Sequence, residues 1–398
     1  MSAWSAERAE DHLLGLELFG MRFGLERMRR LLTALDSPQR VFRAVHVVGT
    51  NGKSSTARFT AAILEAHGVA TGTYLSPHLT RFAERIRVGD RDLTPPAFGA
   101  AVQRVASAAS KVDRGLEPGD RVTQFELVTA TAFAAFAEAG VDVAVVEAGL
   151  GGRHDATAVL EAGVVVLTNV GLEHTRWLGP TVQHIAREKL AVVKKSDPPG
   201  VLVHGELPEG IELPRHARHV TPGPFPTRLP GFQGVNAALA RAAAAEVVEV
   251  DEALARRAVE ATPVPGRFQR VGEAPVTIVD GAHNPSGVAA LRDALGDERI
   301  TAVVSILDDK DATAMLRELL PMCDGALFTA SANPRALPPA TLASLWAQLG
   351  GPPADVEPDP RRALARAREA GRTVVATGSI YLVADLLSEP GTRKASAL

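Results

Sequence analysis

Residues 44–55 read AVHVVGTNGKSS, and this stretch decides the fold class. The β-branched run Ala44–Val48 predicts a buried strand, the glycines after it predict a tight turn, and the apolar spacing from Ser54 to His67 predicts a helix. Two more short apolar strands are predicted at Asp142–Glu147 and Val164–Asn169. Strands that alternate with helices in this way favour βαβ units around a mostly parallel sheet that is covered on both faces.

A proline-rich stretch and a second α/β series divide the chain. Leu207–Gly231 contains six prolines, which predict an extended connector or an edge structure, and Pro263–Gly266 marks a second interruption. Helices are predicted at Val235–Val248 and Asp251–Ala261, and later strands at Val276–Val279, Thr301–Ile306, Ala326–Thr329 and Thr373–Ala376. The strand, the glycine-containing turn GTNGKS and the helix over residues 44–67 are typical of a phosphate-binding loop. We therefore predict a P-loop ATPase domain over residues 1–263 and a smaller Rossmann-like α/β domain over residues 264–398.

The composition excludes several classes of protein. The 43 Lys and Arg residues against 46 Asp and Glu residues give a net charge of −3, so no electrostatic reason exists to expect nucleic acid or an anionic membrane as a partner. The single cysteine, Cys323, excludes an intramolecular disulfide and a cysteine-cage metal site. Charges near the N-terminus stand where a signal peptide needs an apolar core, and no apolar stretch reaches about 18 residues. These features predict a cytoplasmic protein.

The residues between the first predicted strand and helix are typical of a phosphate site. Gly49 and Gly52 allow the backbone to turn tightly, so that successive N–H groups point into the loop at a helix N-terminus. Lys53 can neutralise the outer phosphates of a nucleotide, and the hydroxyl groups that follow it can reach phosphate oxygens or Mg²⁺. The pattern is a shortened Walker loop, because Val47 stands where the longer motif has glycine. A strand-to-helix turn with a solvated lysine is the alternative interpretation.

Polar residues follow the predicted strands at the same edge of the sheet. Glu147 closes one strand, Glu173 and His174 lie just past the next, and Ser76 follows the helix that the phosphate loop begins. Ligands gather outside the carboxyl ends of strands in an open parallel sheet, and carboxylates there suit Mg²⁺. Each residue alone is typical of a solvated loop. Together, beside a phosphate loop, they predict a nucleotide–metal site.

The segment Arg187–Lys194 is predicted to lie on a helix that is reached through Thr181–Ile185. This pattern by itself predicts that Glu188 and Lys189 are ordinary charges on the surface of that helix. Spacing alone therefore gives Lys189 no functional role.

Motifs along nearly the whole chain resemble one family. They run in collinear order from LFGMRFGLER at 18–27 to TGS at 377–379. The most specific are SPHL at 76–79 with ERI at 84–86, GLGGRHDAT at 149–157, and DGAHNP at 280–285. In this order they are similar to the bifunctional dihydrofolate synthase/folylpolyglutamate synthase family of the Mur ligase superfamily.

The resemblance implies an ATP-dependent acid–amino-acid ligase of folate biosynthesis and one-carbon metabolism. Such an enzyme phosphorylates a pterin-type carboxylate to an acyl phosphate, which the amine of L-glutamate attacks to give the amide, ADP and phosphate. The resemblance also implies ATP and two Mg²⁺ ions, small-molecule partners only, and a monomer. The C-terminal domain is implied to close over ATP and to bind glutamate.

The resemblance also assigns site residues by position. The triphosphate would be held by Gly49, Thr50, Asn51, Gly52, Lys53, Ser54 and Ser55, with Asn236, Arg267, Asp280 and His283 as further ATP contacts. The Mg²⁺ ligands would be Ser76, Glu147, His174 and Lys189, the last as a carbamate, and the catalytic residues Lys53, His174 and Lys189. The pteroate pocket would involve Gly24, Leu25, Gln124, Phe125, Glu126, Asp155 and Ala156.

Two other functions stay open at this point. The chain has Ser54, Ala158, Glu173 and Leu190 where the family usually has other residues, so a Mur-type ligase with a different carboxylate substrate is one alternative. A nucleotide-binding homologue without ligase activity is the other. The joint presence of Lys53, Glu147, His174 and Lys189 argues against it, because a decayed site should have lost at least one of them.

Overall fold

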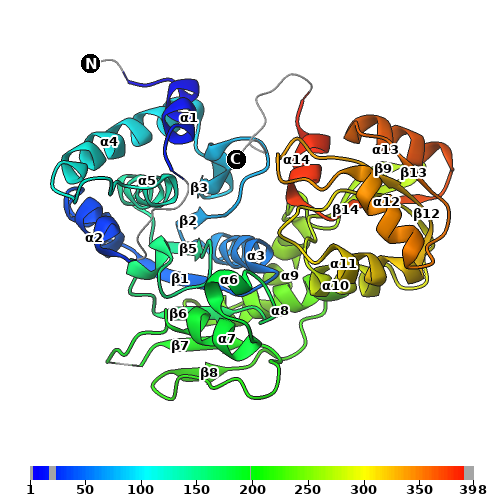
Figure 1. Cartoon of the computed structure of the whole chain (residues 1–398). Coiled ribbons are helices and arrows are strands. Elements are labelled where there is room, and N and C mark those ends of the chain that lie inside the picture. Colours follow the sequence, from blue (N-terminus) through cyan, green and yellow to red (C-terminus); the bar gives the residue numbers. More distant parts are fainter. Residues whose placement is uncertain (1–2, 18–23, 198, 390–398) are drawn as a thin grey trace. The chain divides into compact units, whose positions relative to one another are not determined.

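The computed structural model describes residues 3–17, 24–197 and 199–389, and the chain forms two compact units. Unit 1 consists of Met1–Leu229 with Gln233–Thr262, and unit 2 of Pro230–Phe232 with Pro263–Leu398. Each unit is built on one mostly parallel sheet with helices packed against it (Figure 1). The predicted α/β fold class is therefore confirmed.

The described part of unit 1 has an eight-stranded sheet in the order β4-β3-β2-β5-β1-β6-β7-β8. The strands are β1 (Arg43–Val48), β2 (Thr71–Tyr74), β3 (Ile86–Val88), β4 (Arg91–Asp92), β5 (Val143–Glu147), β6 (Val164–Leu167), β7 (Val201–His204) and β8 (Arg218–Val220). The pairs from β2 to β8 are parallel, whereas β3 and β4 form an antiparallel edge. The central strands β5, β1 and β6 are almost continuously apolar because both faces of the sheet are covered.

Helices pack on both faces of this sheet. The described helices of unit 1 are α1 (Ala6–Leu14), α2 (Glu26–Thr33), α3 (Lys53–Ala66), α4 (Pro95–Asp113), α5 (Gln124–Ala139), α6 (Thr175–Leu178), α7 (Val182–Leu190), α8 (Gly231–Ala245) and α9 (Glu252–Ala261), with 3₁₀ turns η1 (Pro38–Arg40), η2 (Phe82–Arg85) and η3 (Ala156–Val159). The Thr71 hydroxyl donates to Glu65 of α3. At the next residue, a Cβ on Gly72 would lie 2.5 Å from the Phe136 ring of α5. Since successive residues of a strand point to opposite faces, α3 and α5 cover opposite faces.

Unit 2 has a sheet of six described strands in the order β13-β12-β11-β14-β10-β9. The strands are β9 (Gln269–Glu273), β10 (Val276–Val279), β11 (Ile300–Val304), β12 (Cys323–Phe328), β13 (Ala354–Val356) and β14 (Thr373–Thr377), and only β9 pairs antiparallel. The helices are α10 (Pro285–Leu295), α11 (Ala312–Leu319), α12 (Pro339–Gln348), α13 (Pro360–Glu369) and α14 (Ile380–Leu387), with the turn η4 (Leu320–Met322). Its core includes Val304, Met315, Phe328 and Trp346, all buried.

Several predicted boundaries are wrong. Helix α8 spans Gly231–Ala245 rather than Val235–Val248, β11 ends at Val304 rather than Ile306, and β12 begins at Cys323 rather than Ala326. Helix α7 ends at Leu190, so the predicted helix through Lys194 is four residues too long. The apolar run Ala191–Val193 continues the helical pattern, but it packs into the core as a turn, with the Val193 N–H bonded to Leu190 O. Strand β6 ends at Leu167 rather than Asn169 because Thr168 and Asn169 bond to the phosphate loop. The proline-rich stretch contains the edge strand β8, as expected.

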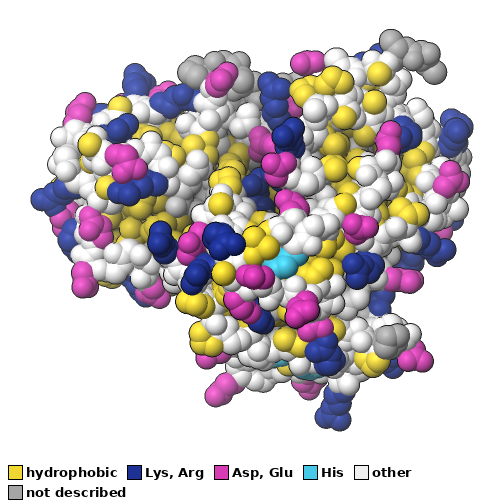
Figure 2. Space-filling model, turned by 180° about the vertical axis from the view of Figure 1, so that it is seen from behind, with side chains coloured by type: hydrophobic (Ala, Val, Ile, Leu, Met, Phe, Trp, Pro, Cys, Tyr) yellow, Lys and Arg dark blue, Asp and Glu magenta, His cyan; other side chains and the backbone are white. Residues whose placement is uncertain are grey.

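Two further expectations can be compared with the described residues. Their helices include none that is long and apolar enough to cross a bilayer. On the face in Figure 2, acidic and basic side chains are interspersed, in agreement with the small net charge. The part of the LFGMRFGLER motif at 18–23 lies outside the described residues.

Candidate active site

The phosphate loop joins the end of β1 to the start of α3. Gly49 and Gly52 have φ values of 149° and 82°, in the region that favours glycine. A Cβ on Gly49 would lie 1.8 Å from Thr168 Oγ1, and a Cβ on Gly52 would lie 2.3 Å from Asn236 Oδ1. Both positions therefore require glycine for two reasons, the backbone conformation and the close approach of another side chain. The contact also places Asn236 of α8, a predicted ATP contact, directly beside the loop.

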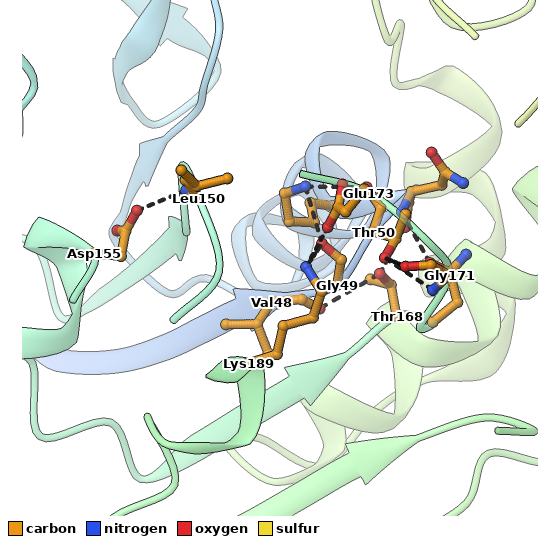
Figure 3. Close-up of polar contacts among 12 residues, drawn as sticks. Val48, Gly49, Thr50, Leu150, Asp155, Thr168, Gly171, Glu173 and Lys189 are labelled. Carbon is orange, nitrogen blue, oxygen red and sulfur yellow. Dashed lines mark hydrogen bonds and ion pairs between the residues drawn. The ribbon is translucent and has the colours of Figure 1, made fainter. Parts of the chain in front are cut away.

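Residues after β6 hold the loop in shape (Figure 3). The Thr50 N–H donates to Asn169 O at 3.1 Å, and the Asn51 N–H donates to Asn169 Oδ1 at 2.9 Å. The Thr168 hydroxyl donates to Asn51 O at 2.6 Å, and the Gly171 N–H donates to Thr50 Oγ1 at 3.0 Å. Sequence reasoning missed these supporting residues. The one sequence feature that could have indicated them is their position directly after β6, the strand that pairs with β1.

Lys53 and the start of α3 form the cationic part of the loop. Lys53 Nζ donates to Gly49 O at 3.1 Å and to Thr50 O at 3.2 Å, so the side chain folds back over the loop. The N-terminus of α3 carries partial positive charge at the same place. An ammonium group and a helix N-terminus together favour a polyanion such as a nucleotide phosphate.

Glu147 accepts hydrogen bonds from two other residues that the sequence predicted for this site. This carboxylate at the end of β5 is 2% exposed. Its Oε1 accepts a hydrogen bond from Ser54 Oγ at 3.0 Å, and its Oε2 accepts one from the Ser76 N–H at 3.0 Å. Ser54 belongs to α3 and Ser76 follows β2, so Glu147 connects the phosphate loop to the neighbouring strand end.

Lys189 is buried, contrary to the expectation from its helical pattern. Its side chain is 1% exposed, and Nζ donates to Gly49 O at 2.8 Å and forms an ion pair with Glu173 (Figure 3). The adjacent Glu188 pairs with Arg153 on the surface, as the pattern predicted. The period of a helix shows which face a residue occupies, but it does not show that the phosphate loop lies against that face.

Burial and charge shift the pKa values of this pair. Burial lowers the pKa of Lys189 to about 8, and the positive charge of Lys53 adds to this effect while Glu173 opposes it. Burial acts to raise the pKa of Glu173, but Lys189 and Lys53 outweigh it and lower the value to about 2. Glu173 is therefore a carboxylate at neutral pH, between two lysines of the site.

His174 lies next to Glu173 with its side chain exposed, at φ 44° on the residue that precedes α6. Among the described residues, no three or more His, Cys, Asp and Glu side chains form a group that could hold a metal ion. A cation at Glu147 would use this carboxylate, the hydroxyl of Ser76 and oxygens of a bound phosphate, with His174 as a further predicted ligand. This donor set fits Mg²⁺, which commonly takes only one or two carboxylates together with substrate phosphates.

The polar residues predicted for the pteroate pocket have partners within the fold. Gln124 Nε2 donates to Leu13 O at 2.9 Å. Glu126 accepts from Arg27 Nε at 3.1 Å and from the Thr123 N–H at 2.9 Å. Sequence reasoning also missed Arg27, which is buried and bonds in addition to Asp120. These contacts fix the N-terminal turn of α5.

The other predicted pocket residues are mostly apolar. Phe125 is half-buried with its ring centroid 6.3 Å from that of Tyr74, and Ala156 is buried at the start of η3. Leu25 packs on a core cluster of unit 1, and Gly24 has φ 152°. Asp155 is 6% exposed and accepts hydrogen bonds from its own loop.

Unit 2 brings its three predicted ATP residues together around one turn after β10. Asp280 accepts from the Phe268 N–H at 2.7 Å and from the Ala282 N–H at 2.8 Å. Burial raises the pKa of Asp280 although Arg267 acts to lower it. A Cβ on Gly281 would lie 2.0 Å from Arg267 Nη1, and His283 Nδ1 is 2.9 Å from Gly281 O.

Two family models match the chain. The Mur ligase middle domain matches residues 47–208, and the Mur ligase glutamate ligase domain matches residues 266–380. With the α/β fold and the phosphate loop, these matches define an ATP-dependent ligase of the Mur type. More narrowly, the chain belongs to the dihydrofolate synthase/folylpolyglutamate synthase family.

Relatives support this family over most of the chain. The dihydrofolate synthase/folylpolyglutamate synthase of Mycobacterium tuberculosis is 33% identical over 82% of this chain and 78% of its own length. The Escherichia coli protein of the same name is 33% identical over 93% of this chain and 92% of its own. The solved Mycobacterium tuberculosis folylpolyglutamate synthase complexed with ADP has a TM-score of 0.87 and 30% identity, and the comparison covers 97% of this chain and 99% of that one.

Proposed function

We propose that the chain joins L-glutamate to dihydropteroate, to folates that already carry glutamate, or to both, in an ATP-dependent reaction. The observation that carries this proposal is the meeting of the phosphate loop, Glu147 and Lys189 at the carboxyl edge of one sheet. Solved relatives support it, because they include complexes with ADP, with DHPP and ADP, and with manganese, AMPPNP and L-glutamate.

The reaction needs an activated carboxylate. A carboxylate does not acylate an amine directly, since the leaving group would be oxide. In the proposed first step a carboxylate oxygen attacks the γ-phosphorus of ATP, and the bond to ADP breaks. The glutamate amine then attacks the acyl carbon, inorganic phosphate leaves, and the amine loses a proton.

Residues of the phosphate loop would lower the barrier to the first step. A negative carboxylate approaches a negative triphosphate, so Lys53 and the N-terminus of α3 would offset their repulsion. Ser76, Glu147 and His174 would hold Mg²⁺, which neutralises phosphate charge when it is bound. Asn236 in unit 1 and Arg267, Asp280 and His283 in unit 2 are proposed to contact the nucleotide.

Lys189 is proposed to act as a carbamate. Its neutral amine would attack CO₂, which forms an N–C bond and releases a proton to solvent. The lowered pKa of Lys189 supports this step, because a pKa of about 8 leaves part of the amine neutral near physiological pH. A carbamate beside the Glu173 carboxylate would need cations nearby, and Lys53 is one of them.

The acyl substrate is proposed to bind near the N-terminal turn of α5. Phe125 supplies an aromatic surface there, with Gly24, Leu25 and Ala156 as further predicted lining residues. Gln124, Glu126 and Asp155 use their side chains within the fold, so we propose that they shape this pocket through the contacts described above.

A glutamate-dependent ADP-release assay tests the proposal. The assay is run in parallel with dihydropteroate and with a reduced folate, and with glutamate omitted as the control. ADP release that requires both glutamate and one of these acyl substrates is the expected result. Turnover only with other carboxylates or amino acids would instead favour a different Mur-type ligase. ATP binding without turnover on any tested pair would indicate a homologue that has lost ligation.

A further inference from the structure

His46 is a buried histidine in the middle of β1, between Val146 of β5 and Val165 of β6. Its side chain is 1% exposed. Burial, with a smaller contribution from the charge of Lys194, lowers the pKa of His46 to about 3. The ring is therefore neutral at physiological pH and needs a polar partner within the fold. That partner is Thr157 of η3, whose Oγ1 lies 2.8 Å from His46 Nε2.

The direction of this hydrogen bond follows from the next residue in the network. The Thr157 hydroxyl donates its only proton to Asp155 Oδ1, so it must accept from His46. Nε2 of His46 therefore carries the ring proton. Three side chains are connected in one direction, from His46 through Thr157 to Asp155.

Asp155 connects this hydrogen-bond network to the loop that follows β5. Its Oδ1 also accepts from the Thr157 N–H at 3.0 Å, and its Oδ2 accepts from the Leu150 N–H at 2.8 Å (Figure 3). The carboxylate therefore joins the start of η3 to the glycine-containing loop 149–152.

The loop 149–152 lies directly against the turn of α7 that carries Lys189. A Cβ on Gly152 would be 2.6 Å from Glu188 O and 3.0 Å from Lys189 Cα. The Arg153 N–H also donates to Glu188 O at 3.0 Å. A shift of the loop would therefore displace the backbone of Lys189.

We propose that His46, Thr157 and Asp155 form a buried positioning relay that holds loop 149–152 and, through it, Lys189 beside the phosphate loop. The three residues act through Lys189, and this inference rests on the proposed function of that lysine. His46 lies in β1, whereas Asp155 bonds to the loop that follows β5. The relay therefore also connects β1 to a loop that is far from it in the sequence.

Thr157→Val tests the relay, because valine keeps the shape of threonine and removes only its hydroxyl. Thr157→Ser keeps the hydroxyl and should recover most of the loss. Thr131→Val is the matched control, since Thr131 is equally buried but its hydroxyl donates within α5, to Leu127 O. His46→Leu is a second test variant that removes the first donor of the relay.

Two measurements are made on each folded variant. Hydrogen-exchange mass spectrometry of the peptide that covers 149–153 should show about tenfold faster exchange in Thr157→Val than in the parent and the control. The Mg²⁺ concentration for half-maximal ADP release should rise, or kcat fall, by roughly tenfold, and Thr157→Ser should restore it. His46→Leu should change the hydrogen exchange and the ADP-release kinetics in the same direction as Thr157→Val.

The outcomes separate this inference from the function on which it rests. Parent-like exchange and turnover in Thr157→Val and His46→Leu, with Lys189→Ala inactive, would overturn the relay alone. Full activity of Lys189→Ala would overturn the role of Lys189 instead. Faster exchange with unchanged kcat and Mg²⁺ dependence would show that the network only stabilises the loop, and this result also overturns the proposal.

Discussion

Lys189 Nζ donates a hydrogen bond at 2.8 Å to the carbonyl oxygen of Gly49, a residue 140 positions earlier in the chain. The same carbonyl accepts from Lys53 at 3.1 Å, so two lysines converge on the first residue of the phosphate loop. Glu173 forms an ion pair with Lys189 and lies close enough to Lys53 for its pKa to be lowered by both. The centre of the candidate site is thus a compact group of alternating charges.

Lys53→Ala should abolish turnover, because it removes the positive charge that faces the transferring phosphoryl group. We expect glutamate-dependent ADP release to fall by roughly 10² to 10³-fold. Lys111→Ala, an exposed lysine on α4, is the matched control and should leave the rate unchanged. A near-parent rate in Lys53→Ala would contradict the assignment of the phosphate loop.

Glu147→Gln should raise the requirement for Mg²⁺. The substitution keeps the shape of the side chain but replaces an anionic ligand with a neutral one. Activity measured over a Mg²⁺ titration should show a half-saturating concentration at least about tenfold higher than in the parent. Glu138→Gln changes an exposed carboxylate that pairs with Arg104 and should give the parent titration curve. Equal curves for both variants would argue against a cation at Glu147.

Glu173→Gln should destabilise the CO₂-depleted protein, because Lys189 is then an ammonium group that stays buried without its carboxylate. The expected loss is about 3–5 kcal/mol in the free energy of unfolding at pH 7, measured by urea denaturation. Glu188→Gln breaks the half-exposed pair with Arg153 and should cost less than about 1 kcal/mol.

The ion pair between Glu173 and Lys189 predicts that the free energy of unfolding depends on pH. The pKa of Glu173 is lowered from 4.5 to about 2 in the folded state, so the stability that its ionisation contributes is complete above pH 4.5. That contribution disappears as the pH falls through about 2, and the difference between parent and Glu173→Gln should shrink over this range. A difference that stays constant from pH 5 to about 2 would contradict the lowered pKa of Glu173.

The activity of the enzyme should depend on CO₂, because Lys189 is proposed to act as a carbamate. Enzyme depleted of CO₂ should regain activity when CO₂ is restored, and at a fixed CO₂ concentration the rate should rise with pH up to about 8, the lowered pKa of Lys189. Between pH 6.5 and pH 8 the neutral fraction of an amine with a pKa of about 8 increases roughly fifteenfold. Lys189→Ala should lack this response and be partly rescued by short carboxylic acids. Parent-like activity of Lys189→Ala without them would exclude a carbamate role.

Long, strongly patterned elements could be predicted from the sequence. The strand, turn and helix over residues 44–67 are unambiguous because the apolar period changes from continuous to helical at two glycines. Very short strands such as β4 and β13 could not be predicted, since two or three residues show no period. The end of α7 was missed because apolar residues that follow it pack into the core as a turn.

The site residues that could be predicted from the sequence are those at the carboxyl end of a strand or directly after it. Ser76 and Glu147 meet because neighbouring parallel strands bring their carboxyl ends to one edge. The burial of Lys189 was not predictable from its helix, since it depends on a contact with Gly49 across the fold. The partners of Gln124 and Glu126 depend likewise on tertiary contacts, with Leu13 and Arg27.

The most direct test of the nucleotide–metal site is a crystal structure with a non-hydrolysable ATP analogue and Mn²⁺, located by its anomalous scattering. We predict a Mn²⁺ peak about 2.1 Å from an oxygen of Glu147, in contact with Ser76 Oγ and with phosphate oxygens held by residues 49–55. A nucleotide and metal bound away from Glu147 and the phosphate loop would contradict the account.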